Sequence, residues 1–412
     1  MITQRKSDMA VVVDHKKRHI VIFALITALC LLGDSMLYIV LPVHYQKMGL
    51  SSLWEVGIIL AVNRIVRLPL NPCIGWLYSH ISERTGIFIA VALAAATTFS
   101  YGFLPNLAFW ILARCVWGVA WTLLRLGSLF CILRLSGSDN RGHYTGLYNG
   151  LYRLGSLVGM LVGGILADLA GITVTVLVFG TATAAAVFLA FFFIPKGNGQ
   201  QKDCVDEASV FTGLVLVARD RKLLWLVMSG CLTALVFQGI VASTLSHFIA
   251  VHASGSLMLL TPLLGAATLA GFFQALRWAW EPWLAPLTGR LSDQRFGRAR
   301  MLSFSCTLGI VAFAALASPL PLSLWFPCIL CMQLTATMLT TLNDAAAADA
   351  AAVSGERMLL MVYALGVDMG AALGPLVAYG VNEFLGINAV YACCAVLFAI
   401  LAAGWRVTAR HG

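Results

Sequence analysis

Long apolar runs separated by short polar segments dominate the chain. A helix needs about 20 apolar residues to cross a hydrocarbon core of roughly 30 Å, and most of the runs approach or exceed that length. Backbone groups in lipid must be hydrogen-bonded within their own segment, and a closed barrel would show strands of about 10 residues that alternate in polarity, so the runs predict helices. Twelve spans are expected, at 20–43, 54–77, 87–104, 107–134, 143–167, 172–194, 223–249, 257–285, 300–318, 321–343, 357–381 and 386–406.

The first run is expected to be a membrane span rather than a cleaved signal peptide. It continues through Leu31 and Met36 to Pro42, which is longer than the apolar part of a signal peptide. No small-residue cleavage site follows it at the right distance.

The longest polar stretch, at 196–222, separates six spans from six. We expect an N-terminal six-helix bundle at 1–195, a cytoplasmic linker at 196–222 and a C-terminal six-helix bundle at 223–412. Within the linker, the run from Val210 to Ala218 is expected to form an interfacial helix. The predicted fold class is an all-α membrane protein with twelve transmembrane helices in two pseudo-symmetric bundles.

The two halves share a weak internal repeat. One set of residues recurs 214 positions later, since Leu70, Pro72, Gly75 and Leu77 correspond to Leu284, Pro286, Gly289 and Leu291. A second set recurs 215 positions later, since Tyr148, Gly155 and Gly159 correspond to Tyr363, Gly370 and Gly374. A duplicated arrangement of this kind is typical of transporters in which two bundles rock around a central site.

Composition and charge narrow the class of protein. The chain is 60% hydrophobic and 11% charged, whereas soluble domains carry about a quarter charged residues, so water is not the solvent of most of it. The net charge of +9 follows the topology: with the N-terminus inside, 20 of the 27 Lys and Arg are cytoplasmic, six lie inside spans and only Lys47 lies outside. This asymmetry predicts a multi-pass inner-membrane protein with both termini in the cytoplasm, and it requires no nucleic-acid partner.

The sequence shows no motif of enzyme chemistry. It lacks a P-loop, an H-E-x-x-H and a G-x-S-x-G motif, and its eight His residues show no metal-ligand spacing. Cys328 and Cys331 lie within an apolar run without a nearby His, so we interpret them as small core residues. We expect no enzyme activity, no metal and no cofactor.

A glycine, an acid and basic residues form a pattern between the eighth and ninth predicted spans. Gly289, Asp293 and Arg298 stand in the run GRLSDQRFGR. This run resembles the loop motif of the major facilitator superfamily, with one extra residue. The resemblance implies close helix packing at the Gly and an Asp that pairs with Arg or a helix end and locks one face shut. The first-half copy has Ser79 where the family has Asp.

A second and a third match lie inside spans. Arg114 and Gly118 resemble the family's Arg-x3-Gly motif in the fourth span, and Gly374 with Pro375 keeps part of a glycine motif in the eleventh. The resemblance is closest to the drug/proton antiporter group and implies efflux, while ordinary small-residue packing is the alternative explanation. The fifth span follows that group's spacing G-x8-G-x3-G-P-x2-G-G, with Met160 in place of Pro, at Gly146, Gly155, Gly159, Gly163 and Gly164.

Ionisable residues within spans are costly in lipid and are usually functional. Arg64 and Arg67 lie on one face of the second span, and Asn63 and Asn71 extend that face into a polar stripe. We expect the stripe to face a cavity or a partner helix.

Positive charges outnumber acids in the first half. Arg64, Arg67, Arg125 and Arg153 stand mid-span against one acid, Asp34. This excess favours an anionic or polar-acidic solute, because Arg presents a planar fork to carboxylate or phosphate. The alternative is that the arginines are structural and pair with acids or backbone carbonyls.

Three acids are candidates for proton coupling: Asp34, Glu281 and Asp368. A desolvated carboxylate is suited to carrying a proton, whereas a permanent ion pair with Arg would disable that role, and both alternatives stay open. The repeat aligns Arg67 with Glu281 and Arg153 with Asp368. Arg277, one turn before Glu281, is expected to pair with it and is a further candidate for substrate binding.

Aromatic residues repeat at helical spacing beside these charges. Trp117, Trp121 and Arg125 follow one another every fourth residue in the fourth span, as do Tyr144, Tyr148 and Tyr152 in the fifth. Such a stripe packs helices or, if it faces a cavity, suits a solute with ring character. Trp121 and Tyr152 are the candidates for solute contact.

Together these patterns predict a secondary active transporter. We expect proton-coupled export of a small amphipathic, anionic organic compound by alternating access, from a monomer whose partners are the solute, protons and the lipid bilayer. An anion importer or exchanger is the first alternative. A non-transporting sensor on a transporter fold is the second.

Overall fold

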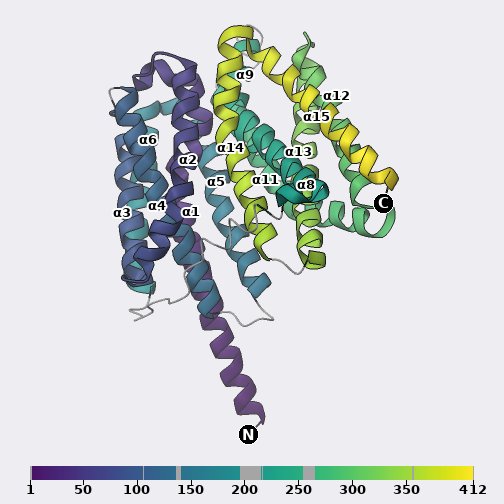
Figure 1. The fold of residues 1–412 in the computed structure, drawn as a ribbon. Helices are drawn as coiled ribbons and strands as arrows, with labels where there is room; N and C mark the ends of the chain where they lie inside the picture. Colours follow the sequence, from purple (N-terminus) through teal and green to yellow (C-terminus); the bar gives the residue numbers. More distant parts are fainter. Residues whose placement is uncertain are drawn as a thin grey trace. The chain divides into compact units, whose positions relative to one another are not determined.

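The structure is a computed structural model that describes residues 2–104, 106–135, 141–194, 215, 217–253, 265–354 and 357–411. All regular secondary structure in these ranges is helical (Figure 1). The expected interfacial helix at 210–218 lies mostly outside the described residues, as does the predicted start of the eighth span.

The first half of the chain forms six long helices. A short 3-10 helix, η1 (Tyr45–Met48), follows the first of them, and Gly49 ends η1 with a φ of 77°. The long helices are α1 (Ile2–His44), α2 (Leu53–Tyr78), α3 (Glu83–Ser100), α4 (Leu107–Leu135), α5 (Arg141–Ala170) and α6 (Ile172–Phe193).

The second half repeats this order with two π-helical segments. Its seventh predicted span is built from α8 (Arg221–Ala234), the π-segment η2 (Leu235–Val241) and α9 (Ala242–Ala253). The other elements are α11 (Ala266–Leu291), η3 (Ser292–Phe296, π), α12 (Arg298–Ala317), α13 (Leu322–Ser354), α14 (Arg357–Leu385) and α15 (Ile387–His411).

Every predicted span coincides with helix in the described residues. Nine of these helical stretches are apolar and long enough to cross a membrane by composition alone. The helices α2, α3 and α11 fall outside that set; α2 carries Arg64 and Arg67, and α11 carries Arg277 and Glu281. These are the residues that the sequence singles out as candidates for function.

The repeat is visible at the turns between helices. Gly171 joins α5 to α6 with a φ of 84°, and Gly386, 215 positions later, joins α14 to α15 with a φ of 80°. This left-handed backbone conformation favours glycine because other residues are strained there. The same sharp turn therefore recurs at the same position of each half.

Glycines also recur where the first and fifth helices of each half cross. In the first half Gly155 lies against the backbone of Ala28, and in the second half Gly370 lies against the carbonyl of Cys231. Small residues at such crossings let two backbones approach closely. The predicted internal repeat is therefore present in the packing of the helices as well as in the sequence.

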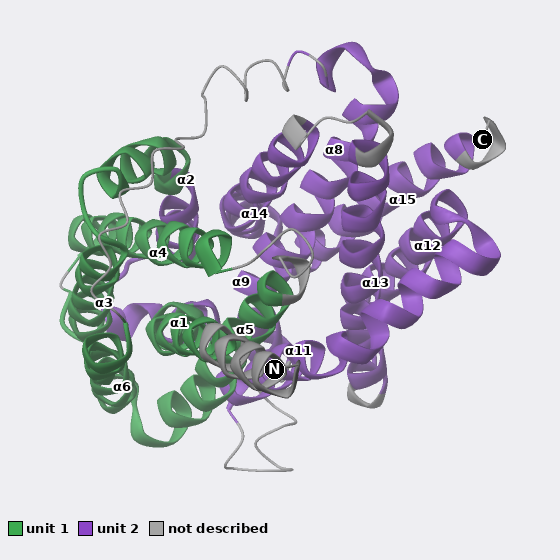
Figure 2. Ribbon diagram, turned by 90° about the horizontal axis from the view of Figure 1, so that it is seen from below, with its two compact units in different colours: residues 1–37, 66–205 green, residues 38–65, 206–412 purple. Residues whose placement is uncertain are grey.

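The chain forms two compact units that differ from a simple division at the linker (Figure 2). Unit 1 contains residues 1–37 and 66–205, and unit 2 contains residues 38–65 and 206–412. Segment 38–65 packs on α14 within unit 2: a side-chain carbon at Gly57 would lie 2.9 Å from the carbonyl oxygen of Pro375. The division at 195 and 222 stays a prediction.

The core of unit 1 lies between α1, α3, α4 and α6. Trp117 is fully buried there, and Tyr78 donates a 2.8 Å hydrogen bond to the carbonyl oxygen of Leu123. Large apolar side chains also stand exposed on the outer surface of the helices, among them Phe188 and Phe192 of α6. Such exposure is expected where lipid covers the surface.

Candidate functional site

A buried ion pair joins α1 to α4 in unit 1. Asp34 and Arg114 approach to 2.5 Å between Oδ1 and Nη1, and both side chains are buried. Arg114 also donates to the hydroxyl of Tyr101 at 3.4 Å, and the Tyr101 ring stacks on Trp110. The structure thus brings together the predicted motif arginine and the predicted proton-coupling acid, a contact that the sequence analysis did not specify.

An aromatic cluster, defined by Trp121, Tyr148 and Tyr152, lies on the facing sides of α4 and α5. The Trp121 and Tyr152 rings meet edge to face at 5.9 Å, and the two tyrosine rings lie 5.1 Å apart. The Tyr148 hydroxyl hydrogen-bonds with Thr27 of α1 at 3.2 Å. The predicted aromatic stripe is therefore fixed in place by packing between three helices.

Arg67 of α2 covers this aromatic cluster. Its guanidinium carbon lies 5.0 Å from the centre of the Trp121 ring, within the range of a cation–π interaction. Arg67 is half-buried and Trp121 is almost fully buried. A cation beside apolar rings is an arrangement that suits a solute with both an acidic group and a ring.

The other residues of the predicted polar stripe have different surroundings. Arg64 donates to the hydroxyl of Tyr38 at 3.4 Å, a contact within unit 2, and Asn63 of the same unit is fully buried. Asn71 belongs to unit 1, as Arg67 does, and is exposed. The boundary between the units at 65 and 66 thus divides the four residues that the sequence placed together.

Three further candidates are exposed rather than enclosed. Arg125 of α4, Arg153 of α5 and Asp368 of α14 each have exposed side chains. Arg125 interacts electrostatically with Tyr148 of the aromatic cluster. Their assignment to substrate binding or proton coupling stays a prediction.

In unit 2, Arg277 of α11 is buried among aromatic rings. Its guanidinium carbon lies 6.0 Å from the centre of Phe237, which belongs to the π-segment η2, and 5.4 Å from the ring of Trp278. Glu281 follows one turn later and is half-buried. Short π-helical segments are frequent at functional sites, and this one presents its ring to a predicted site residue.

A buried pair of amides one turn before Arg277 was missed by the sequence analysis. Gln333 of α13 donates to Gln274 of α11 at 3.3 Å, and both side chains are buried. In α13, Thr337 accepts a 3.2 Å hydrogen bond from Trp280. Uncharged polar residues in apolar runs are a weak signal, but the position of Gln274 beside Arg277 in sequence could have indicated this cluster.

The glycine face of α5 packs on α1. A side-chain carbon would collide with α1 at Gly155 and would lie 2.7 Å from the Leu32 carbonyl oxygen at Gly159 and 2.6 Å from Met36 at Gly163. Gly164 is buried as well. These glycines therefore permit close helix packing. Both explanations of the spacing, a motif of the antiporter group and ordinary small-residue packing, involve such close packing.

The loop motif of the second half forms a network around one arginine. Arg298 lies 2.8 Å from Asp293 and 2.5 Å from Asp349 of α13, and it donates to Ser292 at 2.9 Å. Gly289 has open space around it, so the close helix packing that the family resemblance implies at this glycine is not found. Asp293 thus pairs with an arginine as expected, whereas Asp349 is a partner that the sequence analysis did not identify.

The extra residue of this motif is accommodated by η3. The amide of Gly297 donates to the carbonyl oxygen of Ser292, five residues earlier, at 3.0 Å. A π-turn of this kind takes up one more residue than an α-turn. The repeat offset is 214 residues up to Leu77 and Leu291 and 215 from Tyr148 and Tyr363 onward, so the one-residue length difference falls in an interval that contains η3.

The first half has a counterpart of this network with the charges exchanged. Ser79 is engaged locally, since its hydroxyl donates to the Trp76 carbonyl oxygen at 2.6 Å. Glu83, however, lies 2.8 Å from Arg134. These two residues stand 215 positions before Arg298 and Asp349. Each half therefore joins the start of its third helix to the end of its fourth by an ion pair, with opposite polarity.

Glu83 has an unusual electrostatic environment for a residue before the predicted span at 87–104. Burial raises the pKa of its carboxyl above the ordinary value of 4.5, and the charge of Arg134 opposes that shift. The burial effect is the larger of the two. Arg134 thus favours the ionised form of Glu83 against the effect of burial.

Comparison with known proteins agrees with this architecture. The family model described as Major Facilitator Superfamily matches residues 23–280 and 282–412. A bacterial homologue of the human lysosomal transporter Spinster, inward-facing and unoccupied, is 15% identical, covers 96% of this chain and 97% of that chain, and gives a TM-score of 0.75. The nucleoside transporter NupG is also 15% identical, with coverage of 95% and 98% and a TM-score of 0.74.

No curated protein matches the sequence. The likeness to solved structures at this identity establishes the fold alone. Together with the family match, it confirms the predicted all-α fold of twelve transmembrane helices in two bundles.

Proposed function

We propose, from the premise that this chain belongs to the major facilitator superfamily, that it exports a small amphipathic, anionic organic compound in exchange for protons. Membership in the superfamily makes the chain a multi-pass membrane transporter rather than an enzyme. The direction, the coupling ion and the class of solute are the parts that we propose.

The observation that carries the proposal is Arg67 above the aromatic cluster. A guanidinium binds carboxylate or phosphate through a planar fork, and the neighbouring rings of Trp121 and Tyr152 suit the apolar part of the same solute. The half-buried position of Arg67 strengthens such contacts relative to water. A ring-bearing organic acid is therefore the favoured class of substrate.

The buried ion pair offers a route to proton coupling. Protonation of Asp34 would remove the charge that compensates Arg114, and an uncompensated buried charge costs about 3–5 kcal/mol. A conformation that hydrates or re-pairs Arg114 would then become favoured. We propose Asp34 as the proton-coupling residue, with Glu281 and Asp368 as the other candidates.

The glycine face of α5 and the prolines of α2 support alternating access. Gly155 and Gly159 let α5 lie against α1 without interlocking side chains. Pro69 and Pro72 stand within α2 just after the residue where that helix passes from unit 2 to unit 1. Proline in a helix removes a backbone hydrogen bond and allows bending there.

The proposal is tested by ligand stabilisation of the purified full-length protein. At 100 times its dissociation constant a ligand stabilises by about 2.7 kcal/mol, so a panel of aromatic acids, organic cations and neutral compounds is compared by thermal unfolding. We expect aromatic acids to stabilise the wild type and Arg64→Ala but not Arg67→Ala. Arg64→Ala is the matched control because it removes the same charge from the same helix but contacts Tyr38 instead.

Flux then tests direction and coupling. In proteoliposomes, a stabilising acid should move against an imposed proton gradient, and Asp34→Asn should abolish that coupling. Stabilisation by cations or neutral compounds alone, equal in both Arg variants, would overturn the anionic class. Solute counterflow without dependence on pH would favour the anion exchanger, and binding without flux would favour the sensor.

A further inference from the structure

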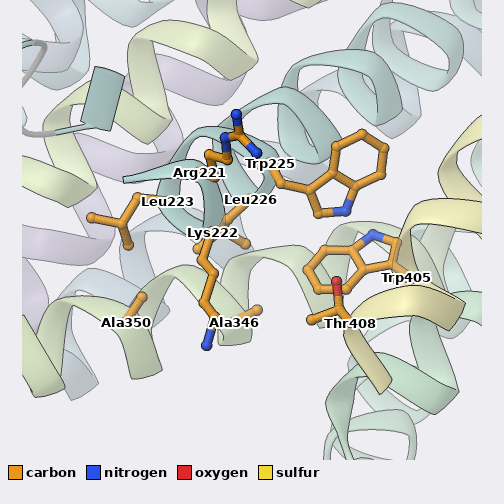
Figure 3. A pocket seen from close by; sticks show the side chains of 9 residues that line it. All are labelled: Arg221, Lys222, Leu223, Trp225, Leu226, Ala346, Ala350, Trp405 and Thr408. Carbon is orange, nitrogen blue, oxygen red and sulfur yellow. The ribbon is translucent and has the colours of Figure 1, made fainter. Parts of the chain in front are cut away.

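We propose that unit 2 holds the phosphate-bearing head group of an anionic phospholipid in a pocket where α8 begins and α15 ends. The pocket has a volume of about 370 Å³ and is drawn in Figure 3. None of the candidate residues for transport lines it. Its lining is Arg221, Lys222, Leu223, Trp225 and Leu226 of α8, Ala346 and Ala350 of α13, and Trp405 and Thr408 of α15.

The charge of the lining is entirely positive. Arg221 and Lys222 are exposed, and the lining contains no acid. Asp220 precedes them, but its carboxylate accepts the backbone N–H of Lys222 at 2.7 Å and so caps α8. Neither cation makes an ion pair with the residues that the structure describes. Two cations that have no ion-pair partner in the described ranges favour an anion with several acceptor oxygens, such as a phosphate.

Two tryptophans make a fixed wall on one side of the pocket. Their rings lie 6.5 Å apart, and Trp405 donates to Ser229 at 3.0 Å. The Trp225 ring packs where Gly404 has no side chain. Tryptophan is enriched at the level of lipid head groups because its ring is apolar and its N–H is polar. The wall is therefore suited to the interface of a bilayer.

The remaining lining is apolar except for Thr408. Ala346 and Ala350 occupy one face of α13 at a spacing of four residues, and Leu223 and Leu226 stand on α8. Figure 3 shows Lys222 extending from α8 toward the α13 face that carries the two alanines. A cation above an apolar floor suits an amphipathic ligand better than a fully hydrated anion.

The position of the pocket, at the basic ends of α8 and α15, agrees with an anionic lipid as its ligand. Both α8 and α15 have their basic residues at this end, which the charge asymmetry predicts to be cytoplasmic. Anionic lipids attract basic residues at a membrane surface, and basic pockets between spans bind anionic head groups. Free phosphate shares the head-group chemistry, so the test separates the two sources.

The experiment measures thermal unfolding of the full-length protein in detergent with phosphatidylglycerol, phosphatidylcholine or inorganic phosphate added. We expect phosphatidylglycerol alone to stabilise the wild type. The variant R221Q/K222Q should bind it about 25-fold more weakly, at about fivefold for each basic residue. The control R290Q/R295Q, which removes two exposed charges from the same unit outside the pocket, should bind it as the wild type does.

A second variant tests the pocket without changing charge. Ala350→Leu narrows the cavity and should weaken phosphatidylglycerol binding while leaving circular dichroism unchanged. Equal binding of phosphatidylglycerol by R221Q/K222Q and the wild type would overturn the site. Equal stabilisation by phosphatidylcholine, or by inorganic phosphate at the same concentration, would overturn the anionic lipid as its ligand.

Discussion

At the scale of single residues, the spans contain charges that are compensated in the folded protein. Asp34 meets Arg114 in the core of unit 1, and Arg277 lies among aromatic rings in unit 2. The sequence identified each of these residues, because charge within an apolar run is rare and costly. It did not identify the partner of Asp34, since 80 residues separate the two and residue spacing along a chain carries no information about contacts between helices.

We expect Arg114→Ala to destabilise the protein by about 3–5 kcal/mol, because Asp34 is left buried with an uncompensated charge. The double variant Asp34→Asn/Arg114→Ala should lose less than Arg114→Ala alone. Thermal unfolding of the wild type, the two single variants and the double variant in one detergent gives the coupling free energy between the two side chains. Strictly additive losses would show that the two side chains do not act as a pair.

Two glycines of α5 provide a matched comparison. Gly155→Ala places a methyl group against the backbone of Ala28 and should destabilise by about 1–3 kcal/mol, as overpacking does. Gly146→Ala meets open space and should be neutral or stabilise by up to about 1 kcal/mol. The thermal unfolding midpoints of the two variants measure the difference. Similar midpoints would show that α1 and α5 accommodate the added methyl group at Gly155 without loss of stability.

At the scale of elements, the sequence predicted the helices well and their connections in part. Apolar runs mark helices directly, because lipid leaves the backbone no other arrangement. The ion pair of Glu83 with Arg134 was missed for a different reason. A search for repeats compares identical residues, and here the second half has a base where the first has an acid.

The ion pair of Glu83 with Arg134 predicts that the effect of a substitution at Arg134 on stability depends on pH. In Arg134→Ala the raised pKa of Glu83 is no longer opposed, so folding disfavours the ionised carboxyl. The loss of stability is expected to be about 1 kcal/mol near neutral pH, a modest value because Arg134 is partly exposed. The loss should disappear as the pH falls below 4.5, the ordinary pKa, because Glu83 is then protonated in both the folded and the unfolded protein.

The matched variant Glu83→Gln removes the buried charge itself. We therefore expect it to be less destabilising than Arg134→Ala near neutral pH. Thermal unfolding of both variants from pH 4 to pH 8 measures this. A loss in Arg134→Ala that stays constant across that range would show that Glu83 does not titrate as described.

At the scale of the whole molecule, the compact units do not follow the order of the chain. Periodicity and polarity placed a division between six spans and six, but segment 38–65 packs with α14 in unit 2. Packing partners depend on surface shape, such as the space that Gly57 leaves for Pro375 and Tyr379. Residue patterns within one helix do not encode that shape.

This packing has a functional consequence that cross-linking measures. The Trp54 ring lies against Gly380, at 3.1 Å from the position of an added side-chain carbon. With Cys204 and the exposed Cys73 and Cys393 replaced by Ser, the variant Trp54→Cys/Gly380→Cys is bridged by a short bifunctional thiol reagent. If transport requires segment 38–65 to separate from α14, bridging should abolish flux and a reductant should restore it. Unchanged flux in the bridged protein would show that this contact persists through the cycle.

The π-turn η3 lets the two halves of the chain differ in length by one residue. It lies between Leu291 and Tyr363, the interval over which the spacing between corresponding residues changes from 214 to 215, and a π-turn holds one residue more than an α-turn. One extra residue inside an α-helix would rotate everything beyond it by about 100°. A π-turn at the end of α11 avoids that rotation, and Arg298 and Asp349 stand in the places that Glu83 and Arg134 have in the first half.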